Sequence, residues 1–105
     1  MKMDRNLNPS GKGKYALINL RKIDGDPRTA QELAAAILAN PGSVEFGAVG
    51  SPDEFWIVKL KDENADACLF GYAGKAVRKD PEFAAEVAEM AHRAGPNSPY
   101  CKSPD

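Results

Sequence analysis

The sequence predicts an α+β domain with a small, mainly antiparallel three-stranded sheet and three helices, in the order β-α-β-β-α-α. Two observations support this prediction. Three segments repeat apolar residues at every second position, as strands do, and three others repeat them every three or four positions, as helices do. With 105 residues, 43% of them hydrophobic and 28% charged, the chain has the size and composition of one globular domain.

The ordered domain is predicted over residues 14–95. Residues 1–13 combine lysine and arginine with asparagine and glycine, and they are expected to form a flexible basic N-terminal arm. Residues 96–105 contain three prolines and no apolar periodicity, so they are expected to form a Pro-rich C-terminal tail.

The first strand is predicted over residues 14–23, where small and aliphatic side chains alternate across two faces. A turn at residues 24–27 leads to Thr29 and Glu32, whose spacing is that of a capping box at a helix start. The helix then carries an apolar stripe of Ala30, Leu33, Ala34, Ile37 and Leu38. It is expected to stop at Asn40-Pro41-Gly42, because proline cannot continue the helical hydrogen bonds.

The second and third strands are predicted over residues 43–49 and 54–61, as an antiparallel hairpin around a turn at residues 50–53. Residues 54–61 are apolar on both faces, which is typical of a strand covered on both sides. Three occupants of the second face remain open: the last helix, the N-terminal arm, or a second copy of the chain in a homodimer.

Two more helices are predicted. Asp62 is expected to cap the first of them, which is apolar over a wide arc and is interrupted by Gly71 and Gly74. Because each internal glycine costs a helix about 1 kcal/mol, a close approach of another backbone is the expected reason for them. Asp80-Pro81 begins the last helix and Gly95-Pro96 ends it.

Several classes of protein are excluded by composition. No apolar run reaches the roughly 20 residues that a membrane-spanning helix needs. Residues 1–14 are polar and resemble no secretory signal, and two cysteines are too few for a disulfide scaffold. A reduced cytoplasmic setting is therefore expected.

The formal net charge of −1 hides an uneven distribution. Residues 1–22 hold six basic side chains and one acidic one, a net charge of +5, and the rest of the chain carries −6. Such a separation is found where a basic arm meets an anionic partner, and equally where a solvated tail lies over an acidic body.

Four segments resemble small hypothetical proteins of bacteriophage and prophage genomes. They read GKGKYALINLRK, SPDEFWIVKLKDENADACLFGYAGKA, DPEFAAEVAEMAHRAG and SPYCKSPD, and together they span most of residues 11–105. No activity is assigned to that group, so no site residue is carried over from it. The resemblance implies a small accessory protein in a bacterial host cytoplasm that acts by binding a host or phage macromolecule.

No set of residues predicts catalysis, a cofactor or a metal. His92 is the single histidine, and it is expected in the exposed last turn of its helix. Cys68 falls on an apolar stripe and is expected to be buried, whereas Cys101 lies in the tail beside Lys102. A structural zinc site usually contains a Cys-x-x-Cys pair, which is absent, and no nucleophile has a base beside it.

The candidate site residues are therefore binding residues. The leading hypothesis is a non-catalytic protein that binds another protein through the acidic face of its last helix and an aromatic side chain in the tail, namely Glu82, Glu86, Glu89 and Tyr100. The alternative is a nucleic-acid-associated protein that uses the basic N-terminal region, with an aromatic ring to stack on a base, namely Lys12, Lys14, Tyr15, Arg21 and Lys22.

Overall fold

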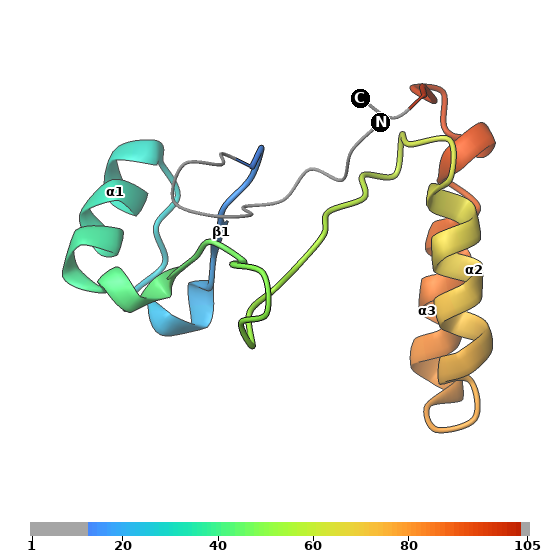
Figure 1. The fold of residues 1–105 in the computed structure, drawn as a ribbon, viewed down its shortest axis with the longest axis horizontal. Helices are drawn as coiled ribbons and strands as arrows, with labels where there is room; N and C mark the ends of the chain where they lie inside the picture. Colours follow the sequence, from blue (N-terminus) through green and yellow to red (C-terminus); the bar gives the residue numbers. More distant parts are fainter. Residues whose placement is uncertain (1–12, 104–105) are drawn as a thin grey trace. The chain divides into compact units, whose positions relative to one another are not determined.

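The computed structural model describes residues 13–103, and its ribbon is drawn in Figure 1. The chain divides into two compact units, Met1–Ile57 and Val58–Asp105, and each is described by itself. Lys12 and the rest of the predicted N-terminal arm lie outside the described residues. The mixed α+β class is confirmed. The first unit contains a two-stranded antiparallel sheet, and within the described residues no third strand joins it, although the sequence predicts three. No helix within residues 13–103 is long and apolar enough to cross a membrane.

The sheet of the first unit is short. Strand β1 (Leu17–Ile18) pairs with β2 (Val44–Glu45), so that Leu17 lies opposite Glu45 and Ile18 opposite Val44. The strand predicted over residues 14–23 is cut short by a 3-10 turn at Leu20–Lys22. The side chain of Asn19 caps this turn by accepting a hydrogen bond from the N–H of Arg21 at 3.1 Å. This local bond offers the backbone an alternative to the sheet, which explains why the strand ends early.

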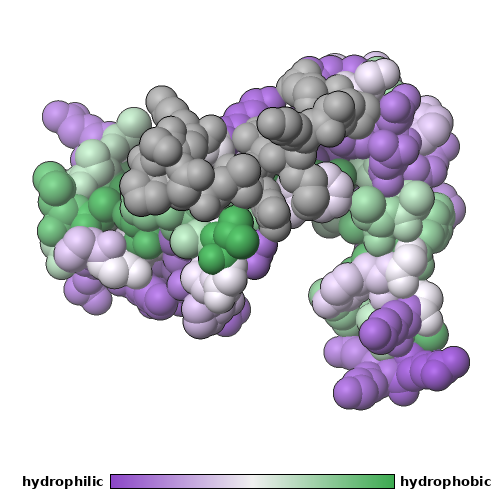
Figure 2. Space-filling model, in the orientation of Figure 1, coloured by the Kyte–Doolittle hydropathy of each residue, from purple (hydrophilic) through white to green (hydrophobic). Residues whose placement is uncertain are grey.

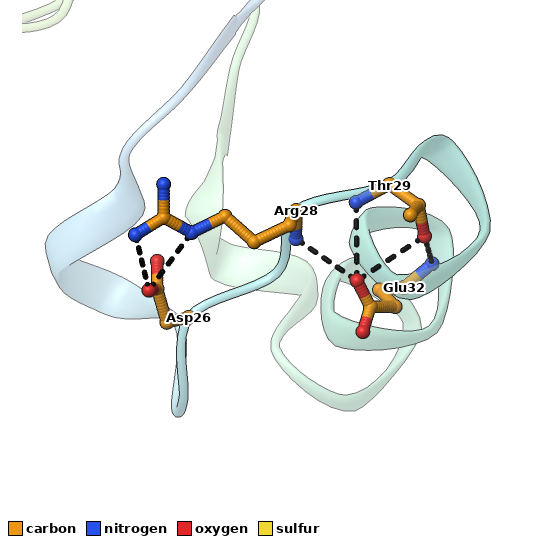
Figure 3. Close-up of polar contacts among 4 residues, drawn as sticks. All are labelled: Asp26, Arg28, Thr29 and Glu32. Carbon is orange, nitrogen blue, oxygen red and sulfur yellow. Dashed lines mark hydrogen bonds and ion pairs between the residues drawn. The ribbon is translucent and has the colours of Figure 1, made fainter.

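Helix α1 (Ala30–Ala39) begins with the capping box that its sequence predicts. Figure 3 shows the Thr29 hydroxyl accepting the N–H of Glu32 at 3.1 Å, while the Glu32 carboxylate accepts the N–H of Thr29 at 3.1 Å. An exposed ion pair between Arg28 and Asp26 (2.7 Å) lies beside it. The helix ends at Asn40, followed by a 3-10 turn at Pro41–Ser43, so both predicted ends are confirmed.

The apolar stripe of α1 is less buried than its pattern predicts. Leu33 and Ile37 are half-buried, Leu38 is 83% exposed, and no residue of α1 is buried. The buried residues of this unit are Ile23, Ser43 and Gly47. A sheet of two residues per strand offers too little surface to cover a ten-residue helix, so much of the stripe remains in contact with solvent.

The predicted hairpin between residues 43–49 and 54–61 is not formed, because β2 pairs with β1 instead. The chain after β2 bends at Gly47 and Gly50, whose φ angles are +65° and +82°. Two further backbone bonds, from the N–H of Ser51 to the C=O of Ala48 (3.0 Å) and from the N–H of Glu54 to the C=O of Ser51 (3.2 Å), tighten the turn. Residues 54–59 leave this turn without regular secondary structure.

The second unit is a pair of packed helices, α2 (Ala65–Ala76) and α3 (Pro81–Ala91), joined by a short connection (Figure 1). The predicted start of α3 is confirmed, because the Asp80 carboxylate accepts the N–H of Phe83 at 3.1 Å and Pro81 is the first helical residue. The predicted cap of α2 is wrong. Asn64 occupies the cap position, and Asp62 instead accepts the N–H of Asn64 at 2.8 Å in a turn before the helix.

The chain after α3 returns to the start of the second unit. Helix α3 ends at Ala91, before the predicted stop at Gly95-Pro96. Gly95, with φ of +58°, instead begins a 3-10 turn at Gly95–Asn97. The N–H of Gly95 donates to the C=O of Leu60 (2.8 Å), and the N–H of Lys102 donates to the C=O of Lys61 (2.9 Å). The described part of the predicted tail is thus tied by backbone hydrogen bonds to the segment that precedes α2.

Candidate binding surface

The interface between α2 and α3 is built from alanines. The buried hydrophobic residues of this unit are Ala65, Ala73, Ala84, Ala91 and Ala94. Small side chains let the two helices approach closely, but they leave no room between the helices for larger groups. Leu69 and Val87 are half-buried beside these alanines. The other large apolar side chains of the unit are exposed, namely Leu60, Phe70, Tyr72, Val77, Phe83, Met90 and Tyr100. The wide buried arc predicted for α2 is therefore wrong, and Cys68 is exposed as well.

Helix α3 presents two neighbouring stripes to solvent. Phe83 and Met90 are seven residues apart and lie on one side of the helix, and both are partly exposed. The predicted residues Glu82, Glu86 and Glu89 form a parallel stripe next to them, and all three are exposed. Glu89 lies 3.9 Å from Arg93 one turn later, an exposed contact. We call the two stripes together the α3 surface.

Two edge-to-face ring pairs connect the helices. The rings of Tyr72 and Phe83 have centroids 6.0 Å apart at 80°, and those of Phe70 and His92 are 5.7 Å apart at 79°. The first pair extends the apolar stripe of the α3 surface onto α2 and restrains Phe83. His92 lies at the C-terminal cap of α3 and is exposed, as its sequence position predicts.

A hollow of about 830 Å³ lies where α2 turns into α3. It is lined by Gly71, Tyr72, Gly74, Lys75, Ala76, Arg78, Lys79, Asp80 and Phe83. Three basic side chains thus gather around the Tyr72–Phe83 pair, and the carboxylate of Asp80 already accepts the N–H of Phe83. Figure 2 shows strongly hydrophilic residues at this end of the helix pair. The basic triplet Lys75, Arg78 and Lys79 is not among the site residues predicted from the sequence. Its signal in the sequence is three basic residues within five positions.

The close approach of another backbone that was expected at Gly71 and Gly74 of α2 is not found in the described chain. A Cβ added at Gly71 or Gly74 would meet no described atom within 4 Å, so no other backbone of the described chain approaches them. Both glycines line the hollow, and their missing side chains keep it open.

The basic residues predicted near the N-terminus are spread over separate settings. Lys14 Nζ lies 5.7 Å from the centre of the Tyr15 ring, and Tyr15 is half-buried. Lys22 and Arg21 both lie in the 3-10 turn: Lys22 Nζ is 3.8 Å from the carboxylate of Glu45 in β2, and Arg21 is exposed. The Tyr15 ring therefore lies beside Lys14, and the Lys22 ammonium lies beside the Glu45 carboxylate.

The remaining candidates lie in the tail. Tyr100 is 77% exposed, and its N–H donates to the Ser98 hydroxyl at 3.1 Å. Cys101 is a free, exposed thiol. Within residues 13–103, no group of three or more His, Cys, Asp or Glu side chains has the geometry to hold a metal ion.

Comparison of the chain with protein-family models, with curated protein sequences and with solved structures finds no match. The surface itself is therefore the basis for a functional proposal.

Proposed function

We propose that this chain is a non-catalytic, phage-like accessory protein that works by binding another protein through the α3 surface. One observation carries the proposal: the helix pair fully buries only alanines, and it leaves its aromatic side chains and Met90 exposed. Exposed apolar groups of this size gain free energy when a partner covers them, at about 25 cal/mol per Å² of apolar area removed from water.

The charge on α3 indicates the chemistry of the partner. An apolar stripe of Phe83 and Met90 flanked by Glu82, Glu86 and Glu89 is complementary to a surface that carries apolar and basic side chains together. Charges at the rim of such an interface raise the association rate and select the partner, while the buried aromatic groups supply most of the affinity. The proposed partner is accordingly a basic protein with an apolar strip, of host or phage origin.

The test is capture from a bacterial host lysate under native conditions, with three forms of the full chain as bait. Wild-type protein is compared with a variant of the acidic stripe, Glu82→Gln/Glu86→Gln/Glu89→Gln, and with Phe83→Ala. We expect a basic protein to be retained by the wild type and reduced at least about tenfold by Phe83→Ala, because truncation of a central aromatic anchor costs about 2 kcal/mol. The acidic-stripe variant should also retain less of it, because charges at the rim of an interface speed association.

A matched control removes three acidic charges elsewhere, in Asp24→Asn/Asp26→Asn/Glu63→Gln. It changes the net charge by the same amount and leaves α3 intact, so it should retain the partner as the wild type does. Equal retention by all four forms, or retention of no basic protein, would contradict the proposal.

A second candidate function rests on the basic triplet Lys75, Arg78 and Lys79 around the hollow. Cations beside an exposed aromatic pair are a common arrangement for single-stranded nucleic acid, in which phosphates pair with the cations and bases stack on the rings. This second candidate places a nucleic-acid site at the turn between α2 and α3, in addition to the N-terminal residues that the sequence predicts for the same function.

The second candidate is tested with labelled single-stranded and double-stranded oligonucleotides between 50 and 200 mM salt. Because each phosphate contact on a single strand contributes a slope of about −0.7 to log K against log salt, Lys75→Gln/Arg78→Gln/Lys79→Gln should flatten the slope by about 2. The comparison variant is Lys14→Gln/Arg21→Gln/Lys22→Gln. No binding at 50 mM salt, or a loss seen only with the comparison variant, would exclude the hollow as the site.

A further inference from the structure

Residues 55–58 combine a strong sequence preference with an unused backbone. The run Phe55, Trp56, Ile57, Val58 consists only of aromatic and β-branched residues, the types most enriched in strands. Within the described chain, the N–H and C=O groups of these four residues make no hydrogen bond. A strongly strand-forming segment with free backbone groups is a template for pairing with another strand.

The neighbouring backbone is already engaged on both sides of this run. Before it, the N–H of Glu54 donates to the C=O of Ser51 at 3.2 Å. After it, the C=O of Leu60 accepts from Gly95 and the C=O of Lys61 accepts from Lys102. The available stretch is thus sharply bounded, and within it Trp56 is 55% exposed while the other three side chains are half-buried.

The charges around the run identify its partner. Asp53 and Glu54 precede the run, whereas Lys59 and Lys61 follow it. If a second copy of the same segment pairs antiparallel, the acidic end of each copy lies against the basic end of the other. A parallel pair would place acids against acids and lysines against lysines, which is unfavourable. The segment is therefore complementary to itself in one direction only.

We propose that residues 55–58 form a homodimer interface, in which two copies of the chain pair as antiparallel strands about a two-fold axis. In an antiparallel pair, residues opposite each other have their side chains on the same face of the sheet. In a symmetric pair the two-fold axis must therefore pass between one residue and the same residue of the second copy. With Ile57 at the axis, Trp56 lies opposite Val58 of the second copy, and Asp53 lies opposite Lys61 of the second copy. With Trp56 and Val58 as the hydrogen-bonded pair, the pairing supplies backbone hydrogen bonds for these two residues of each copy and places the Trp56 ring beside the second copy. It does not depend on the α3 surface.

The first measurement is the mass of the full chain in solution across about 1 to 500 μM, by sedimentation or light scattering. We expect the mass to rise from 11.3 kDa toward twice that value. Trp56 is the only tryptophan, so its emission should shift to shorter wavelength over the same range as the ring leaves water. A mass that stays at that of one chain, with unchanged emission, overturns the proposal.

The second measurement exchanges the charges. Asp53→Lys/Glu54→Lys makes both ends basic and Lys59→Glu/Lys61→Glu makes both ends acidic, so each variant alone should self-associate about tenfold or more weakly than the wild type, by like-charge repulsion across the strands. Mixed in equal amounts, the two variants should form a heterodimer, which also shows that both are folded. The matched control Asp24→Lys/Glu63→Lys reverses two charges outside the segment, at exposed residues, and should dimerise like the wild type. Wild-type dimerisation by either variant alone, or failure of the mixture to associate, overturns the proposal.

Discussion

Substitution of Gly47 by alanine is expected to lower the free energy of unfolding of the first unit by about 3 kcal/mol. Two costs combine at this position. The φ of +65° costs a residue with a Cβ roughly 1–2 kcal/mol, and the new Cβ would lie 2.5 Å from Cδ2 of the Phe55 ring. Because Gly47 is buried, the ring must move away, at the further cost of disturbed packing, about 1–3 kcal/mol.

Two other glycines of the same unit provide controls for Gly47→Ala. Gly25 and Gly50 also have positive φ, but a Cβ at either would meet no described atom within 4 Å. Gly25→Ala and Gly50→Ala should each cost only the backbone strain, about 1 kcal/mol. The measurement is urea unfolding followed by Trp56 fluorescence. Equal losses for all three variants would show that the Phe55 ring does not press on Gly47.

Substitution of Ala84 by leucine is the second large effect, with an expected loss of about 2 kcal/mol in the second unit. Ala84 is 3% exposed and belongs to the alanine interface of α2 and α3. Three additional carbon atoms do not fit between helices held together by methyl groups, so the helices must separate or adopt strained side-chain conformations. Helix propensity is not involved, because alanine and leucine differ little in that respect.

The neighbouring residue Ala85 is the matched control for Ala84→Leu. It is exposed on the same helix, so Ala85→Leu should change stability by no more than about 0.5 kcal/mol. Helical circular dichroism in urea reports both variants. If the Ala84→Leu protein is as stable as the Ala85→Leu protein, α2 and α3 do not pack closely at Ala84.

The features that sequence reasoning predicted correctly are local ones. The capping box of Thr29 and Glu32, the stop after Ala39 and the start of α3 at Asp80-Pro81 are all present. Each depends on contacts within about one turn of backbone, so neighbouring residues determine it almost alone. The exposure of Glu82, Glu86 and Glu89 was predictable for a similar reason, since their spacing places them on one face of a helix whose other faces are apolar.

The errors concern which distant segments meet. The same β-prone sequences were compatible with a hairpin between residues 43–49 and 54–61, yet β2 pairs with β1 and residues 54–59 form no strand. Aspartate is a favoured helix cap, but the Asp62 carboxylate accepts the N–H of Asn64, which lies before the first residue of α2. In both places two arrangements satisfy local preferences, and only long-range packing distinguishes them.

The sequence by itself determined the start and stop of α1, the start of α3, where the acidic stripe lies and that residues 55–58 are strand-forming and flanked by opposite charges. Tertiary structure alone decided that alanines fill the helix interface, that Phe83 and Met90 remain exposed, and that Lys75, Arg78 and Lys79 surround one hollow. Periodicity shows which side chains share a face, but burial depends on what lies opposite that face. In this chain the opposing surfaces are small, and for that reason apolar residues with core-like spacing stay at the surface, where a partner can bind them.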